Sequence, residues 1–231
     1  MFNKYTPKFP PHALATSYQR FLGDCHLCDQ PKKSGVLICN YCHQQLQRVP
    51  ILKIDDKLPL IVGGFYDVPF NRVMSAYKDH EDLSALMVLY HLLCWLPKPK
   101  GLTAQTAIII PTPTTKSRLI KRGFNPVLVL AKFLAYHWQI PLWQGVLREN
   151  NQIHQRGLSR SQRLKNVQED FYLAETIPKV RHAILFDDVV TTGATLQAIA
   201  KVVQEHNPKI HTVGFAVLHG KPGIHLPFLA K

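Results

Sequence analysis

The sequence predicts an α/β protein built on a parallel sheet, with a small cysteine-rich module at its N-terminus. Expected strands and helices alternate from residue 60 onward, which is typical of a parallel sheet. Two expected strands, 106–111 and 182–188, are apolar almost throughout and therefore suit burial on both faces. The module is indicated by four cysteines near the start of the chain. A length of 231 residues suits one medium-sized domain with a small appendage.

The N-terminal cysteines form two Cys-x-x-Cys pairs with ten residues between them. Such pairs in a chain without a secretory leader indicate a metal site, and a redox or structural set of cysteines without metal is the alternative. Two pairs supply four thiolates to a tetrahedral Zn²⁺, and a site closed by four sulfurs is structural. The expected ligands are Cys25, Cys28, Cys39 and Cys42.

The ends and boundaries of the chain give further expectations. The first residues, MFNKYTPKFPPH, have no apolar leader core, and the longest apolar stretch, 85–96, is too short to cross a bilayer. We therefore expect a cytoplasmic protein without a membrane span. The expected division is an N-terminal arm with the metal module (1–50), a linker between prolines (51–59) and the α/β domain (60–231).

The remaining elements follow from hydrophobic periodicity and from proline and glycine breakers. The expected helices are a short one at 41–49, two at 70–80 and 82–96, one beginning near Asn125, and one at 194–206. The expected strands are a strand or bent hairpin at 60–67 with a break at Gly63 and Gly64, a strand near Val146, and a last strand at 210–219. The polar stretch 149–166 is expected to be a mobile loop that runs into a short helix.

The chain is strongly basic, with 28 lysines and arginines against 15 acids and a net charge of +13. This favours a polyanionic partner, namely a nucleic acid, a phosphorylated small molecule or an anionic membrane face; a charge that serves only solubility is the alternative. The distribution favours an anion site, because residues 115–165 contain a single acid, Glu149. The bases of that stretch are Lys116, Arg118, Lys121, Arg122, Lys132, Arg148, Arg156, Arg160, Arg163 and Lys165.

The stretch ILFDDVVTTGATL (184–196) places two adjacent acids between an apolar strand and a hydroxyl-rich turn. Asp187 and Asp188 fall at the carboxyl end of the strand, where open α/β sheets bind ligands. The turn leads into a helix whose unpaired N–H groups can hold a phosphate, and Gly193 lets the backbone approach it closely. Vicinal ribose hydroxyls donate well to carboxylates. A ribose 5-phosphate would therefore satisfy both halves of the stretch, and an ordinary turn with a threonine cap is the alternative.

This stretch is similar to the signature with which type I phosphoribosyltransferases bind 5-phosphoribosyl 1-diphosphate (PRPP). The whole chain resembles the ComF/GntX family, whose competence-associated members join a four-cysteine zinc module to a phosphoribosyltransferase-like domain. The matching features are the paired cysteines, AYKDH, IIPTPTTKSRLIKRGFNP, GLSRSQRLKN and ILFDDVVTTGATL, in that order. Thr112 and Pro126 depart from the resemblance, since the family often has valine and glutamine at these positions.

The resemblance implies that the two acids hold the ribose hydroxyls, that the following turn holds the 5-phosphate and that PRPP carries Mg²⁺. It also implies that the turn at 111–113 faces the diphosphate with two arginines nearby, and that two further arginines lie on a loop that closes over the site. The implied ligand-binding residues are Pro111, Thr112, Pro113, Asp187, Asp188, Val189, Val190, Thr191, Thr192, Gly193, Ala194 and Thr195, with Lys78 as a further phosphate contact. The implied arginines are Arg118, Arg122, Arg156 and Arg163.

Two functions from different classes follow. The resemblance implies an accessory protein of DNA uptake in natural transformation, which handles single-stranded DNA, retains a PRPP or ribose 5-phosphate site and works with proteins of the uptake or recombination machinery. The alternative is a metabolic phosphoribosyltransferase that transfers phosphoribose from PRPP to a nucleobase or another nucleophile. The zinc module and the net charge favour the first. The sequence names no acceptor and leaves open whether the protein is an enzyme.

Overall fold

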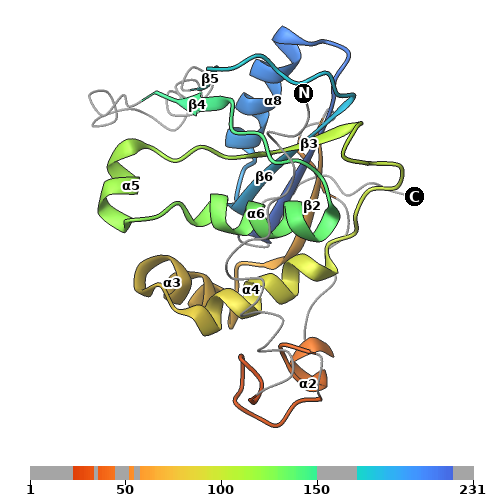
Figure 1. Cartoon of the computed structure of the whole chain (residues 1–231). Helices are drawn as coiled ribbons and strands as arrows, with labels where there is room; N and C mark the ends of the chain where they lie inside the picture. Colours follow the sequence, from red (N-terminus) through yellow and green to blue (C-terminus); the bar gives the residue numbers. More distant parts are fainter. Residues whose placement is uncertain (1–22, 34–35, 45–51, 55–57, 150–170, 221–231) are drawn as a thin grey trace.

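The computed structural model of the protein describes residues 23–33, 36–44, 52–54, 58–149 and 171–220 (Figure 1). Among these residues, no helix is both long enough and apolar enough to cross a membrane.

A five-stranded sheet, in the order β1-β2-β7-β6-β3, forms the centre of the described chain. Its parallel strands are β2 (Leu58–Phe65), β7 (His211–His219), β6 (His182–Val190) and β3 (Ala107–Pro111). The short strand β1 (Leu52–Ile54) pairs antiparallel with β2 at one edge. The predicted α/β fold with a parallel sheet is therefore confirmed, and β6 lies inside the sheet between β7 and β3 as its apolar sequence requires.

Helices cover both faces of this sheet (Figure 1). On one face, α4 (Leu83–Trp95) and α6 (Pro126–Trp138) contact the strands, and α3 (Phe70–His80) packs on α4. On the other face lies α8 (Ala194–His206), which contacts β6. Alternate residues of the strands accordingly belong to two separate apolar clusters, with Ile184 on the α4 and α6 side and Leu185 on the α8 side.

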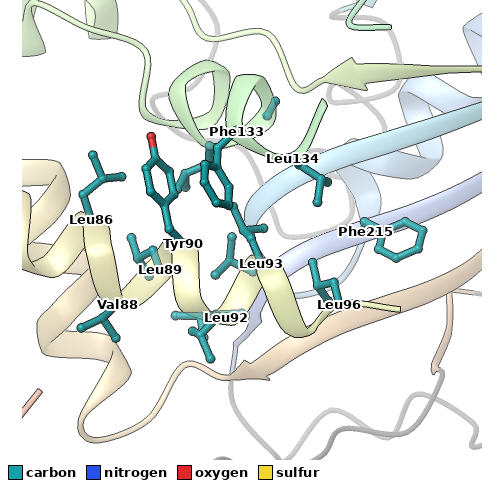
Figure 2. Close-up of a cluster of buried hydrophobic side chains, with 14 of the residues drawn as sticks. Leu86, Val88, Leu89, Tyr90, Leu92, Leu93, Leu96, Phe133, Leu134 and Phe215 are labelled. Atoms are coloured by element: carbon teal, nitrogen blue, oxygen red, sulfur yellow. The ribbon is translucent and has the colours of Figure 1, made fainter. Parts of the chain in front are cut away.

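The cluster between α4, α6 and the sheet is the larger one (Figure 2). Tyr90 of α4 stacks on Phe133 of α6 with ring centroids 3.9 Å apart and an interplanar angle of 8°. Leu93 of α4, Leu96 directly after that helix and Phe215 of β7 belong to the same buried cluster. Because α4 is buried along nearly its whole length, it fixes the position of every element that packs on it.

The cysteine module joins this same cluster. Its short helix α2 (Asn40–Gln44) lies beside α4 in Figure 1, and Leu37 and Ile38 are buried together with residues of α3 and α4. His43 of α2 contacts His91 of α4 through nitrogens 3.2 Å apart, and its ring lies 4.2 Å from the ring of Trp95. The module therefore shares part of its core with the larger domain.

Two predicted details of the fold are wrong, and two features of the structure were not predicted. The expected linker 51–59 contributes β1 and the first residues of β2, because the prolines that flank it permit an edge strand. Gly63 and Gly64 do not break β2, which runs without interruption to Phe65. The other additions are the helix α5 (Lys116–Arg122) and the pairing of β4 (Val146–Arg148) with β5 (Phe171–Leu173). Most of the expected mobile loop 149–166 lies outside the described residues.

Gly63 allows β2 to approach its neighbours closely, and this gives a test of the packing. A Cβ atom at Gly63 would lie 2.8 Å from the backbone oxygen of Val217, whereas one at Gly64 would meet only a leucine methyl at 3.6 Å. Gly63→Ala is expected to lower the free energy of unfolding by about 1–3 kcal/mol, measured by urea denaturation. The matched control Gly64→Ala should change it by less than about 0.5 kcal/mol. Equal effects of the two variants would contradict the packing of β2 described here.

Candidate functional site

The candidate site lies at the carboxyl ends of β3 and β6. Pro111 at the end of β3 is paired in register with Phe186 of β6, so the turn that begins at Thr112 lies beside Asp187. The Thr112 N–H donates to the carbonyl oxygen of Phe186 over 2.8 Å. The hydroxyl of Thr112 is buried and lies near the carboxyl group of Asp187, whose pKa it lowers. The predicted juxtaposition of the 111–113 turn with the two acids is therefore present.

Asp188 is a buried carboxylate with a cationic partner. Only 6% of the residue is exposed, and its Oδ2 lies 2.8 Å from the Nζ of Lys78 on α3. A buried carboxylate requires a partner of this kind because water no longer solvates its charge. The contact places Lys78 beside the two acids, and its partner is a carboxylate, whereas the resemblance implies a phosphate.

Asp187 points to the opposite side of the strand and is only partly accessible. One of its carboxylate oxygens accepts a hydrogen bond from the Asp188 N–H over 2.9 Å. Burial and the neighbouring Asp188 carboxylate raise the pKa of Asp187 to about 7, against the opposing effects of that N–H and of Lys78. Two adjacent acids with unlike environments and a raised pKa are typical of a ligand site.

The chain after β6 leads into the N-terminus of α8. Val189 and Val190 still belong to β6, and Val190 is buried in the α8-side cluster. Thr191 and Thr192 are exposed, and Gly193 has φ 77°, a conformation that favours glycine.

Gly193 is also the N-cap residue of α8 and has no side chain that could accept from the N–H groups of the helix. The Thr192 hydroxyl accepts from Ala194 N–H over 3.4 Å. An open helix N-terminus next to exposed hydroxyls can bind a phosphate.

Of the four arginines that the resemblance implies, the structure describes two. Arg118 and Arg122 lie on α5, a helix of seven residues none of which is buried. Arg118 is exposed, and the Nη2 of Arg122 lies 3.5 Å from the Oδ1 of Asp79 on α3. Arg156 and Arg163 lie outside the described residues. The structure thus ties α5 to the helix that carries Lys78.

His219, at the carboxyl end of β7, is a residue that sequence reasoning missed. It is paired in register with Val190, is 2% exposed, and neither ring nitrogen has a hydrogen-bond partner in the described part of the chain. Burial lowers the pKa of His219, against the opposing effect of the Thr191 backbone. The following Gly220 donates its N–H to the carbonyl oxygen of Val190, and a Cβ there would clash with Thr191. The only signal in the sequence is a histidine that ends an apolar strand.

The four module cysteines form a cluster that could hold a metal. Their sulfur atoms all lie within 4.8 Å of one another, and backbone N–H groups of Leu27 and Cys42 donate to the sulfurs of Cys25 and Cys39. Burial raises the pKa of the Cys25 thiol, but these and other hydrogen bonds outweigh it and lower that pKa to about 7. Four mostly buried sulfurs with N–H donors suit a closed tetrahedral metal site.

Comparison with known proteins places these features in a wider context. The family model described as the phosphoribosyl transferase domain matches residues 128–227, which include Asp187, Asp188 and the turn before α8. Competence protein F of Haemophilus influenzae is 29% identical over 197 residues, which cover 79% of this chain and 85% of that protein. The DNA utilization protein YhgH of Escherichia coli K12 is 28% identical over 185 residues, which cover 78% of this chain and 77% of that protein. A solved xanthine-guanine-hypoxanthine phosphoribosyltransferase of Helicobacter pylori is 14% identical, with a TM-score of 0.40 over 64% of this chain and 81% of that one.

The raised pKa of Asp187 predicts how stability depends on pH. The folded protein binds a proton at Asp187 more tightly than the unfolded chain does, so this residue lowers stability as the pH rises from about 4 to about 7. Asp187→Asn removes the penalty. The variant should exceed the wild type in free energy of unfolding by on the order of 1–3 kcal/mol at pH 8, and by less at pH 5. Urea denaturation at both pH values measures this, and a difference that does not grow with pH would contradict it.

Proposed function

We propose, on the premise that this chain is a phosphoribosyltransferase-domain homologue of competence protein F and DNA utilization protein YhgH, that it binds PRPP and handles single-stranded DNA in DNA uptake. The observation that carries the PRPP part is the sequence of Asp187, Asp188 and an uncapped helix N-terminus at the carboxyl edge of a parallel sheet. The relationship to competence and DNA utilization proteins supports the DNA part.

Each part of PRPP has a counterpart of suitable chemistry. The ribose hydroxyls donate to Asp187 and Asp188, and the 5-phosphate accepts from N–H groups and hydroxyls of Thr191 to Thr195. The diphosphate faces the turn at 111–113, which begins beside Asp187, and the cations Lys78, Arg118 and Arg122. Arg156 and Arg163 are proposed to belong to a closing loop, as the resemblance implies.

The same residues suit the bond cleavage that PRPP undergoes. When diphosphate leaves, positive charge develops at the anomeric carbon of the ribose and negative charge on the diphosphate. The carboxylates of Asp187 and Asp188 favour the first charge, and the cations of α3 and α5 favour the second. Mg²⁺, bound mainly through PRPP and water, would supply further charge neutralisation at the diphosphate. The acceptor of the phosphoribosyl group is not identified by any of these residues.

The metal of the cysteine module is proposed to be structural Zn²⁺. Four sulfurs from Cys25, Cys28, Cys39 and Cys42 match the ligand type and number that this ion takes in closed sites. The ion would neutralise thiolates that burial otherwise disfavours, since burial raises the pKa of the Cys42 thiol. It would thereby hold α2 against α4.

The helix α5 supports binding to a nucleic-acid backbone. Its Arg118 and Lys121 are exposed, and none of its seven residues is buried. A helix that contributes nothing to the core and exposes its cations is free to contact phosphates. It lies in the basic stretch 115–165, most of whose charge a PRPP site alone would not use.

A substitution at Gly193 tests the phosphate-binding turn. Gly193→Val places a branched side chain where the backbone should contact the 5-phosphate, and should weaken Mg²⁺-PRPP binding by about 2–4 kcal/mol in a calorimetric titration. Gly101→Val is the matched control, since Gly101 has a similar φ of 78° with open space around it, in the turn after α4. It should bear the same backbone strain and bind PRPP normally. Unchanged affinity in folded Gly193→Val would refute the assignment of this turn.

The salt dependence of DNA binding tests the second part of the proposal. If the basic stretch neutralises about three to five phosphates of single-stranded DNA, the slope of log affinity against log salt should be about −2 to −3.5, measured by fluorescence anisotropy with oligo(dT). Reversal of Arg118, Lys121 and Arg122 to Glu should weaken binding and flatten the slope.

The double variant Asp187→Asn with Asp188→Asn is the control for this experiment. It should lose PRPP while binding DNA equally well or slightly better, because it removes two negative charges. A wild-type protein that binds PRPP but no DNA at low salt would make the metabolic phosphoribosyltransferase the better account.

A further inference from the structure

One turn of α3 engages both kinds of charge that the proposed PRPP site needs. Lys78 lies 2.8 Å from Asp188, a proposed ribose ligand, and the next residue, Asp79, lies 3.5 Å from Arg122, a proposed diphosphate ligand. An acid and a base of the proposed site are therefore each paired with α3. The helix itself is held in place by the buried Tyr77, whose hydroxyl donates to the carbonyl oxygen of Pro126 over 3.0 Å.

The two pairs differ in strength. The side chains of Lys78 and Asp188 are 19% and 8% exposed, so solvent and salt screen their attraction only weakly. The side chains of Arg122 and Asp79 are 33% and 53% exposed, and an ion pair of that kind contributes little. The ion pair between Arg122 and Asp79 can thus break at little cost. To separate Lys78 from Asp188, by contrast, the ammonium group needs another anion and the carboxylate needs another donor.

PRPP offers both replacements, and ribose 5-phosphate offers one. The ribose hydroxyls can donate to Asp188 in place of the ammonium group, but only the diphosphate provides an anion near the anomeric carbon to which the ammonium can move. A ligand without the diphosphate either leaves Lys78 unpaired or must share Asp188 with it, and a desolvated ammonium without a partner is costly.

We propose that Lys78 is a specificity-determining residue that transfers its charge from Asp188 to the diphosphate when PRPP binds. This rests on the proposed function, and it adds that the site selects PRPP over ribose 5-phosphate through this exchange. Lys78 suits the role because a lysine ammonium is a compact charge on a flexible stem, which can change partners without the bidentate geometry that an arginine prefers.

The test is the affinity of each variant for Mg²⁺-PRPP and for ribose 5-phosphate, measured by calorimetry on the full chain. Lys78→Met should weaken PRPP binding at least about tenfold, because a charge-assisted contact is lost. The same variant should bind ribose 5-phosphate as well as the wild type or up to about tenfold better, because a competitor for Asp188 is gone. The two affinities are thus expected to move in opposite directions, or at least to diverge.

Two variants complete the design. Lys78→Arg keeps the charge and should retain the preference for PRPP within about threefold. Lys201→Met removes a lysine from an exposed position on α8, where it pairs with Glu205, and should alter neither affinity. Thermal unfolding is measured first, and if Lys78→Met shows no cooperative transition, Lys78→Gln, whose amide can still donate to Asp188, replaces it.

Each outcome separates this inference from the proposed function. Equal weakening of both ligands by loss of Lys78 would show that the lysine only holds Asp188 in place, and would overturn the exchange while the PRPP site stands. Unchanged PRPP affinity in Lys78→Met would overturn it as well. Wild-type protein that binds neither ligand would overturn the proposed function together with this inference.

Discussion

Two neighbouring carboxylates at the end of a buried central strand are the constraint around which this protein is built. Their environments differ: Asp188 forms an ion pair with Lys78 of α3, whereas burial and the neighbouring carboxylate raise the pKa of Asp187. The pairing of Asp188 with Lys78 requires α3 to pack on α4 in a fixed position relative to the sheet. The raised pKa of Asp187 means that ionisation of this carboxyl group becomes more favourable when hydroxyl donors bind it. Under the proposed function, a bound ribose would give both carboxylates hydroxyl donors in addition to, or in place of, these neighbours.

The packing of α4 connects the cysteine module to this site. Helix α4 contacts α2, since His43 lies against His91 and Trp95. It also packs against α3, the helix that carries Lys78. The buried cysteines and the apolar residues of α3 and α4 belong to one cluster. A metal that holds the module folded would therefore also cover part of the core against which α3, the helix that carries Lys78, is packed.

Much of this arrangement could be predicted from sequence, for identifiable reasons. Strands β3 and β6 were predicted because they are apolar almost throughout, and helix α8 because its apolar residues recur at helical spacing. The order of strand, acids and turn then predicted a site at the carboxyl edge of the sheet. Helix α5 escaped prediction because KSRLIKR buries no side chain and so shows no apolar face. The pairing of Lys78 with Asp188 and the burial of His219 also escaped, since they depend on contacts between residues far apart in the chain or on a strand end that periodicity does not mark.

The central claim is that the turn from Thr191 to Thr195 receives the 5-phosphate while the two acids receive the ribose. The most direct test is a crystal structure of the protein with Mg²⁺ and PRPP. We expect the 5-phosphate at the N-terminus of α8, within hydrogen-bond distance of the N–H groups after Gly193, and the ribose hydroxyls on Asp187 and Asp188. Density for the ligand at any other place in the molecule, with this edge of the sheet left empty, would contradict the account.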